Sequence, residues 1–140
     1  MIDIASIVQD VDWYKAEPAE EIEIQKLIAN AGIDLPEEYI AFLRFSNGGG
    51  GKLGINPGWF QLWKAEEVIQ LNKAYQVDKY LPGFFGFGSN GGDELLAFPK
   101  SKEKSWKVVM IPFIPMDAKL AILVANNFEE FISAIGKEYD

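Results

Sequence analysis

The stretch that decides the fold runs from Leu81 to Pro99 and reads L-P-G-F-F-G-F-G-S-N-G-G-D-E-L-L-A-F-P. An apolar run ends at S-N-G-G (89–92), and a second apolar run begins at Leu95. Asn-Gly between two β-prone runs is a strong local signal for a hairpin, because a tight turn needs residues that accept positive φ. The stretch therefore predicts two antiparallel strands, with Asp93 and Glu94 just past the turn.

Length and composition indicate a single globular domain. The chain has 140 residues, of which 49% are hydrophobic and 14% aromatic, so it can bury a substantial core. No apolar run approaches the roughly 20 residues that a membrane span needs. There is no Cys, and Met1 is followed by Ile2 and Asp3 without a basic or apolar signal region. We therefore expect a cytoplasmic protein without membrane association.

The charge disfavours nucleic acids as ligands. The net charge is −8, and Arg44 is the only arginine, although arginine is the residue best suited to phosphate and guanine contacts. Ten of the 21 carboxylates lie between Asp3 and Glu38, where there are only two lysines. Such an acidic segment either keeps the protein soluble or suits a basic partner.

Hydrophobic periodicity and end signals predict the remaining elements. Helices are expected over residues 3–11, about 18–32, 35–47, 65–75 and 127–136. Short strands are expected over residues 53–55, 59–63, 106–113 and 120–125, in addition to the hairpin. The glycines at 48–51 are expected to link a helix to a strand, and the lysine-rich residues 100–104 to form a solvated loop.

The order of these elements predicts the fold class. Helices come first, strands dominate the middle, and a helix closes the chain. This order is typical of an α+β fold with a central antiparallel or mixed sheet and helices packed on one face.

The residue types exclude several kinds of active site. The chain has no His and no Cys, so nucleophile–histidine systems and the usual zinc sites cannot be built. The glycines of Gly86-x-Gly88-x-x-Gly91 are followed by a predicted strand instead of the helix that a dinucleotide site needs. Lys52 after the glycine run is followed by Leu53, so a phosphate-binding loop also fails. We predict no catalytic residue, no cofactor site and no metal site.

Five residues are candidates for contact with a partner: Asn90, Asp93, Glu94, Trp13 and Tyr14. The turn carboxylates either accept hydrogen bonds within the turn or face a partner, and we expect Asp93 to hold the turn. Adjacent residues on a strand point to opposite faces, so this pair is poorly placed for acid–base catalysis. Trp13 and Tyr14 either form a surface patch or fold back onto the core.

Four stretches in order resemble the SUKH superfamily, which includes a fungal regulator of cell-wall synthesis and many bacterial proteins. They are LPEEYIAFLRFSNGGG (35–50), FQLWKAEEVIQLNKAY (60–75), FGSNGGDELLAF (87–98) and ANNFEEFI (125–132). The resemblance implies one α+β domain with its core at 18–135, preceded by a helical extension at 1–17, and no established catalytic centre. Asn47, Gly48 and the turn residues 91–93 match the family pattern, and we interpret them as fold-forming.

The resemblance also implies a function. Bacterial members look like immunity proteins that neutralise toxins of competing cells, so the leading expectation is a non-enzymatic domain that binds a toxin with a basic surface. The alternative is a regulatory or scaffold protein of cell-wall or signalling assemblies, similar to the fungal member. A carboxylate-based enzyme or small-ligand binder that uses the aromatic middle of the chain is a third possibility. The sequence does not predict an oligomeric state.

Overall fold

The computed structural model describes residues 2–100 and 106–140. Within these ranges the helices are α1 (Ile4–Ile7), α2 (Glu21–Asn30), α3 (Glu37–Phe45), α4 (Ala65–Ala74), α5 (Val77–Tyr80) and α6 (Phe128–Ser133), with a 3-10 turn at Ala118–Leu120. The strands are β1 (Trp13–Tyr14), β2 (Gly49–Lys52), β3 (Trp59–Leu62), β4 (Phe84–Ser89), β5 (Glu94–Pro99), β6 (Val108–Pro112) and β7 (Ile122–Ala125).

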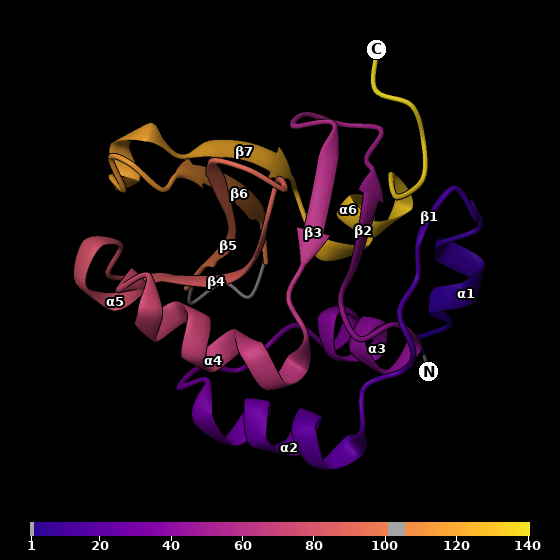
Figure 1. Ribbon diagram of the computed structural model, residues 1–140, viewed down its shortest axis with the longest axis horizontal. Coiled ribbons are helices and arrows are strands. Elements are labelled where there is room, and N and C mark those ends of the chain that lie inside the picture. The colour runs from indigo at the N-terminus through magenta and orange to yellow at the C-terminus, as the bar shows by residue number, and fades with distance from the viewer. Residues whose placement is uncertain (1, 101–105) are drawn as a thin grey trace.

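The strands form one sheet in which each pairs with its neighbours in the sequence. The order is β1-β2-β3-β4-β5-β6-β7, and every pair is antiparallel. α4 and α5 lie along the β4 side of the sheet, and α6 lies behind β2 and β3 (Figure 1). The predicted α+β class with an antiparallel sheet is therefore confirmed.

The β4–β5 hairpin lies in the middle of the sheet, as the Leu81–Pro99 stretch predicts. Phe85 pairs with Phe98 and Ser89 with Leu95, with a register shift between Gly86 and Gly88. Such a bulge bends the strand that contains it. Four consecutive residues in each strand are buried, so the hairpin is covered on both faces.

An aromatic core lies between α3, α6 and the hairpin. Tyr39 of α3 and Phe128 of α6 contact Phe87 and Phe98, with ring centroids 5.4–5.8 Å apart. Phe87 and Phe98 stack on each other at 4.2 Å. Each such pair contributes about 0.5–1.5 kcal/mol beyond the apolar area that it buries. These contacts hold α3 and α6 on one face of the sheet.

The N-terminal segment differs from the prediction of a helix over residues 3–11. α1 ends at Ile7, and Trp13–Tyr14 forms a two-residue strand that pairs with Gly50 and Gly51. The glycine run is accordingly a strand and not a link. Glycine is required there because a Cβ at Gly49 (φ 116°) would lie 2.5 Å from the Tyr14 carbonyl oxygen.

Several other boundaries also differ. α2 begins at Glu21 instead of near Pro18, and of the expected strand at 53–55 only Leu53 makes a bridge, to Ile135. The short helix α5 was not predicted, because its start depends on a left-handed Gln76 (φ 57°). Most of the expected lysine-rich loop (101–104) lies outside the described residues.

Candidate partner-binding surface

The first three strands have one buried face and one exposed face. Trp13, Gly51 and Phe60 lie opposite one another across β1, β2 and β3 and face the core. Side chains alternate along a strand, so the next row points outward, and it consists of Tyr14, Gly50 and Gln61. Trp59 points outward two residues before Gln61. We call these four residues the outer β1–β3 face; α6 lies behind it in Figure 1.

Two aromatic side chains stand on this face. Tyr14 is 71% exposed and Trp59 is 49% exposed. Because Gly50 between them has no side chain, a hollow runs over β2, with volumes of about 320 Å³ on the Gln61 side and about 450 Å³ on the Lys52 side. Tyr14, Gly50 and Trp59 line both parts. We call this hollow the Gly50 groove.

One end of the Gly50 groove continues into an acidic hollow of about 400 Å³. The two share Tyr14, Ala16, Asn47 and Lys64, so they form one continuous depression. The acidic hollow is lined by Glu17, Glu20, Glu23 and Glu66.

Asn47 organises the acidic hollow. Its Oδ1 accepts a hydrogen bond from the backbone N–H of Ala65 at 2.7 Å, and its Nδ2 donates to Glu66 Oε1 at 2.9 Å. This donation lowers the pKa of the Glu66 carboxyl. Asn47 therefore caps the start of α4 and keeps Glu66 charged. This arrangement agrees with our interpretation of Asn47 as a fold-forming residue.

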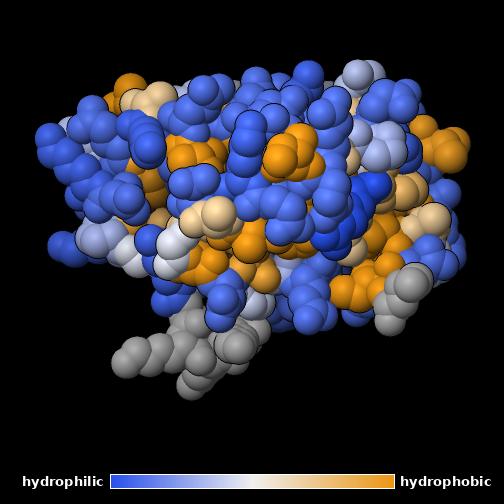
Figure 2. All heavy atoms as spheres, turned by 90° about the horizontal axis from the view of Figure 1, so that it is seen from below, coloured by the Kyte–Doolittle hydropathy of each residue, from blue (hydrophilic) through white to orange (hydrophobic). Residues whose placement is uncertain are grey.

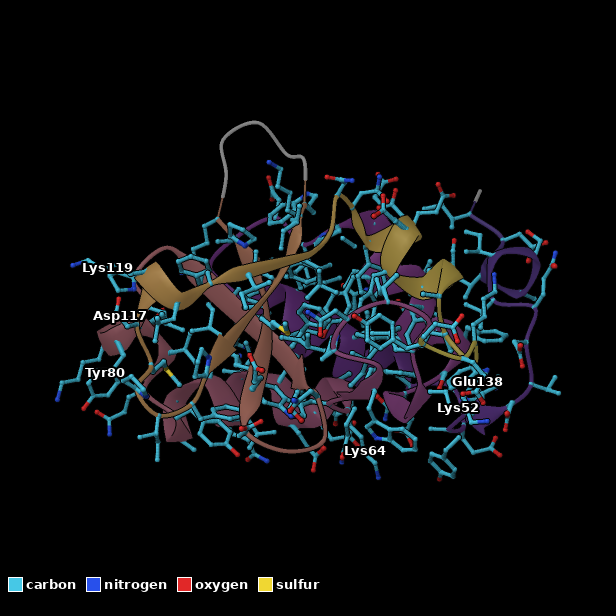
Figure 3. All side chains as sticks on the ribbon, turned by 90° about the horizontal axis from the view of Figure 1, so that it is seen from above. Lys52, Lys64, Tyr80, Asp117, Lys119 and Glu138 are labelled. Atoms are coloured by element: carbon cyan, nitrogen blue, oxygen red, sulfur yellow. The ribbon has the colours of Figure 1, made fainter. Side chains whose placement is uncertain are left out.

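The other end of the groove carries a neutralised lysine. Lys52 Nζ lies 2.8 Å from Asp12 Oδ2 and 2.6 Å from Glu138 Oε1. The hydrogen bonds that Lys52 donates to these two carboxylates raise the pKa of Lys52. Figure 3 shows Lys52 and Glu138 together, at the end of the molecule opposite to Tyr80, Asp117 and Lys119. Lys52 thus links β2 to both the N-terminal and the C-terminal segments.

The hairpin turn lies beside the outer β1–β3 face. A Cβ at Gly91 (φ 83°) would lie 2.8 Å from Trp59 Cδ1, so Trp59 rests on the turn backbone. The predicted residues Asn90, Asp93 and Glu94 belong to this turn. The structure therefore places the turn that contains them against Trp59, which borders the Gly50 groove together with Tyr14.

Within the turn, Asn90 makes the hydrogen bonds expected of Asp93. Asn90 Oδ1 accepts from the backbone N–H groups of Gly92 and Glu94, both at 3.0 Å. Within the described part of the chain, the side chain of the exposed Asp93 makes one hydrogen bond, which its Oδ1 accepts from Asn90 Nδ2 at 3.4 Å. The expectation that Asp93 holds the turn is wrong, because Asn90, which precedes both donors in the chain, already accepts their hydrogen bonds.

Trp13 does not belong to the exposed surface. Its ring packs against Phe42, Phe45 and Phe60 at 6.1–6.5 Å, and its Nε1 donates to the Asp10 carbonyl at 2.8 Å. Trp13 thus follows the alternative in which it folds onto the core, whereas its neighbour Tyr14 is at the surface. The exposed Trp59 was missed as a candidate, although it alternates with the buried Phe60 in the sequence.

A second apolar surface lies at the far end of the sheet. A hollow of about 620 Å³ is lined by Tyr75, Tyr80 and residues 113–117. Ile114 is 91% exposed there, and the edge strand β7 exposes Ile122 and Leu123 by about half. We call this surface the β7 end. The face seen from the α2 side is, in contrast, mostly hydrophilic, with apolar side chains at separate places (Figure 2).

The described residues contain no group of three or more His, Cys, Asp and Glu side chains placed to hold a metal ion. Among the helices in residues 2–100 and 106–140, none has the length and apolar character to cross a bilayer.

This architecture is that of an α+β domain built on one antiparallel sheet with an exposed outer face. A model of the SMI1 / KNR4 family (SUKH-1) matches residues 18–134. The chain therefore belongs to this family, which confirms the resemblance drawn from its four motifs. In a comparison with curated proteins, no relative matches the chain.

Proposed function

We propose that this protein is a non-enzymatic protein-binding domain, and specifically an immunity protein that neutralises a bacterial toxin in the cytoplasm by direct binding. The observation that carries the proposal is the outer β1–β3 face, where exposed Tyr14 and Trp59 stand beside the hairpin turn. Exposed Tyr and Trp are the residues most often found at the energetic centres of protein interfaces. Asn90, Asp93 and Glu94 would form the rim of this interface.

The charge of the domain supports a basic partner. The net charge is −8, and Glu17, Glu20, Glu23 and Glu66 gather at one end of the exposed face. Complementary charge accelerates encounter and disfavours wrong partners. A toxin that acts on nucleic acid has a basic active site, so binding by this face would both attract the toxin and occlude its active site.

The test uses as ligands the proteins encoded by the genes that flank this one, among which the proposal expects a toxin domain. Association rates are measured at about 50 and 500 mM salt, for the native protein and for Tyr14→Ala, Trp59→Ala and the control Tyr80→Ala. We expect the association rate to fall with salt, and we expect weaker binding only for the first two variants. Absence of any complex would overturn the proposal, and a salt-independent association rate would remove its electrostatic part.

A second candidate is a regulatory or scaffold role in cell-wall or signalling assemblies. The β7 end favours it, because a scaffold needs a second surface for a second partner, and Ile114, Ile122 and Leu123 are exposed there. In this case the gene would lie among cell-wall or signalling genes, and the protein would bind two of their products at once. Competition between the two products for a single surface would argue against the scaffold role.

A further inference from the structure

We propose that the Gly50 groove is a binding site for a cationic side chain, an arginine in an extended segment of the partner protein. This inference rests on the proposed protein-binding function and names the chemistry that the outer β1–β3 face recognises. Three features of the groove carry it: its aromatic walls, its bare floor and its charge.

The walls are aromatic and accessible. Tyr14 comes from β1 and Trp59 from β3, and both border the hollow on each side of Gly50. Aromatic faces attract cations through the ring quadrupole, most strongly for Trp and for the planar guanidinium group, which also stacks on the ring. The backbone of Tyr14 is held by strand pairing to Gly50, so its side chain starts from a fixed position on β1.

The floor leaves room for one planar group. Tyr14, Gly50 and Gln61 lie side by side across the three strands. Neighbouring strands are about 4.8 Å apart, so Tyr14 and Gln61 stand roughly 10 Å apart over the bare glycine. Trp59 pairs with Lys52 and lies two residues from Gln61 along β3, diagonally across Gly50 from Tyr14. A flat group between two side chains needs about 7–8 Å, which is twice the usual carbon–carbon contact distance, so it fits over Gly50 between Tyr14 and Gln61, with Trp59 beside it.

The charge around the groove selects a cation. Lys52 at one end is bonded to both Asp12 and Glu138 and is therefore neutralised. At the other end, Glu17 and Glu20 form no ion pair with any lysine or arginine of the described residues. Lys64 borders the same hollow, but Glu66 and Glu67 lie two and three residues after it, in the first turn of α4. An arginine over Gly50 would thus place its neighbouring basic residues beside Glu17 and Glu20.

The test uses a defined probe, the peptide acetyl-Gly-Arg-Gly-Arg-Gly-amide. Its control is the same peptide with citrulline, which keeps the shape of arginine and removes the charge. Backbone amide NMR shifts and calorimetric titration are recorded at low salt. We expect shifts at Gly49, Gly50, Gly51 and the Trp59 indole for the arginine peptide, and about tenfold weaker binding of the citrulline peptide.

Variants separate the walls from the acidic end. Tyr14→Ala is expected to weaken binding of the arginine peptide about fivefold. The double variant Glu17→Gln, Glu20→Gln is expected to weaken this binding by a similar factor and to reduce its dependence on salt. Tyr80→Ala and Glu129→Gln are matched controls on other surfaces, and we expect them to leave the affinity for the arginine peptide unchanged. Circular dichroism and thermal unfolding verify that each variant is folded.

The outcomes distinguish the groove from the proposed function. Any of three results would overturn the proposed arginine site: equal binding of the two peptides, NMR shifts confined to other surfaces, or unchanged peptide binding by Tyr14→Ala. If the toxin still binds native protein and the Tyr14→Ala variant equally well, the groove inference fails and the immunity function stands. If no protein partner binds while the arginine peptide fills the groove, the site stands and the immunity function fails.

Discussion

Asn72 of α4 and Gly86 of β4 are joined by two hydrogen bonds that replace a missing strand. The Asn72 Nδ2 donates to the Gly86 carbonyl at 2.8 Å, and the Gly86 N–H donates to Asn72 Oδ1 at 2.9 Å. β3 pairs with β4 only near Ser89 and Gly88, so the backbone of Gly86 has no strand partner on that side. The side-chain amide satisfies both of its buried polar groups.

Asn72→Ala is expected to lower the free energy of unfolding by about 2–3 kcal/mol, because it leaves a buried N–H and a buried carbonyl without partners. Denaturant unfolding measures the change. Asn72→Asp should lower the free energy of unfolding at least as much, since one carboxylate oxygen would then face the Gly86 carbonyl. The control is Asn30→Ala, which removes one exposed side-chain hydrogen bond to Lys26 and should change stability by less than about 0.5 kcal/mol. An unaffected Asn72→Ala variant would show that the amide is not needed at the strand edge.

The second prediction concerns the hairpin turn, where the contributions of Asn90 and Asp93 to stability are expected to differ. Asn90→Ala removes the acceptor of the Gly92 and Glu94 N–H groups and should cost about 1–2 kcal/mol. Asp93→Ala should change stability by less than about 0.5 kcal/mol, because its carboxylate is exposed and, among residues 2–100 and 106–140, accepts only one long hydrogen bond of 3.4 Å. Thermal or denaturant unfolding of the two variants side by side checks this order. The reverse order would restore Asp93 as the residue that holds the turn.

Those parts of the fold that have a local signal in the sequence were predictable. The hairpin follows from Asn-Gly between two apolar runs, and the start of α6 follows from Asn127, whose Oδ1 accepts from the Glu130 N–H at 2.7 Å. The inward and outward sides of β3 follow from the alternation of Trp59 and Phe60. In each case a few neighbouring residues determine the structure.

The remaining features depend on pairing between distant segments. β2 consists of three glycines and a lysine, so it has no hydrophobic pattern, and β1 is only two residues long. Which of Trp13 and Tyr14 is buried is set by their register against Gly51 and Gly50. The Gly50 groove arises from that same register, and therefore the candidate site could be predicted only in part.

A pH dependence is expected from the pair that joins α2 to α3. Arg44 binds Glu21 through two hydrogen bonds, Nε to Oε2 at 3.0 Å and Nη2 to Oε1 at 2.7 Å. The Arg44 bonds lower the pKa of Glu21 to about 2. The unfolded value is about 4.3. Since the folded pKa is the lower one, the pair stabilises the fold above the unfolded pKa, and this contribution is lost as the pH falls from about 4 to 2.

The measurement is the stability of native protein and Glu21→Gln across pH 2–7. The native protein should be the more stable at pH 7, and the difference should disappear near pH 2. Arg44→Gln should show the same convergence, and the double variant should lose no more than either single variant, because both remove one interaction. A difference that is constant over this pH range would show that the ion pair does not contribute.

The buried hydroxyl of Tyr39 gives the last prediction. Tyr39 is fully buried among Phe87, Phe98 and Phe128, and its hydroxyl has no hydrogen-bond partner among the described residues. Burial raises the pKa of this hydroxyl. A buried polar group without a partner opposes folding by about 1–3 kcal/mol, whereas the ring itself contributes to the aromatic core.

Tyr39→Phe keeps the ring and removes the hydroxyl, so the free energy of unfolding should stay equal or rise by up to about 2 kcal/mol. Tyr39→Leu, which also removes the edge-to-face contacts, should lower it, and Tyr80→Phe at the surface serves as the control. A Tyr39→Phe variant that is clearly less stable than the native protein would mean that the hydroxyl has a partner, such as a buried water molecule, inside the core.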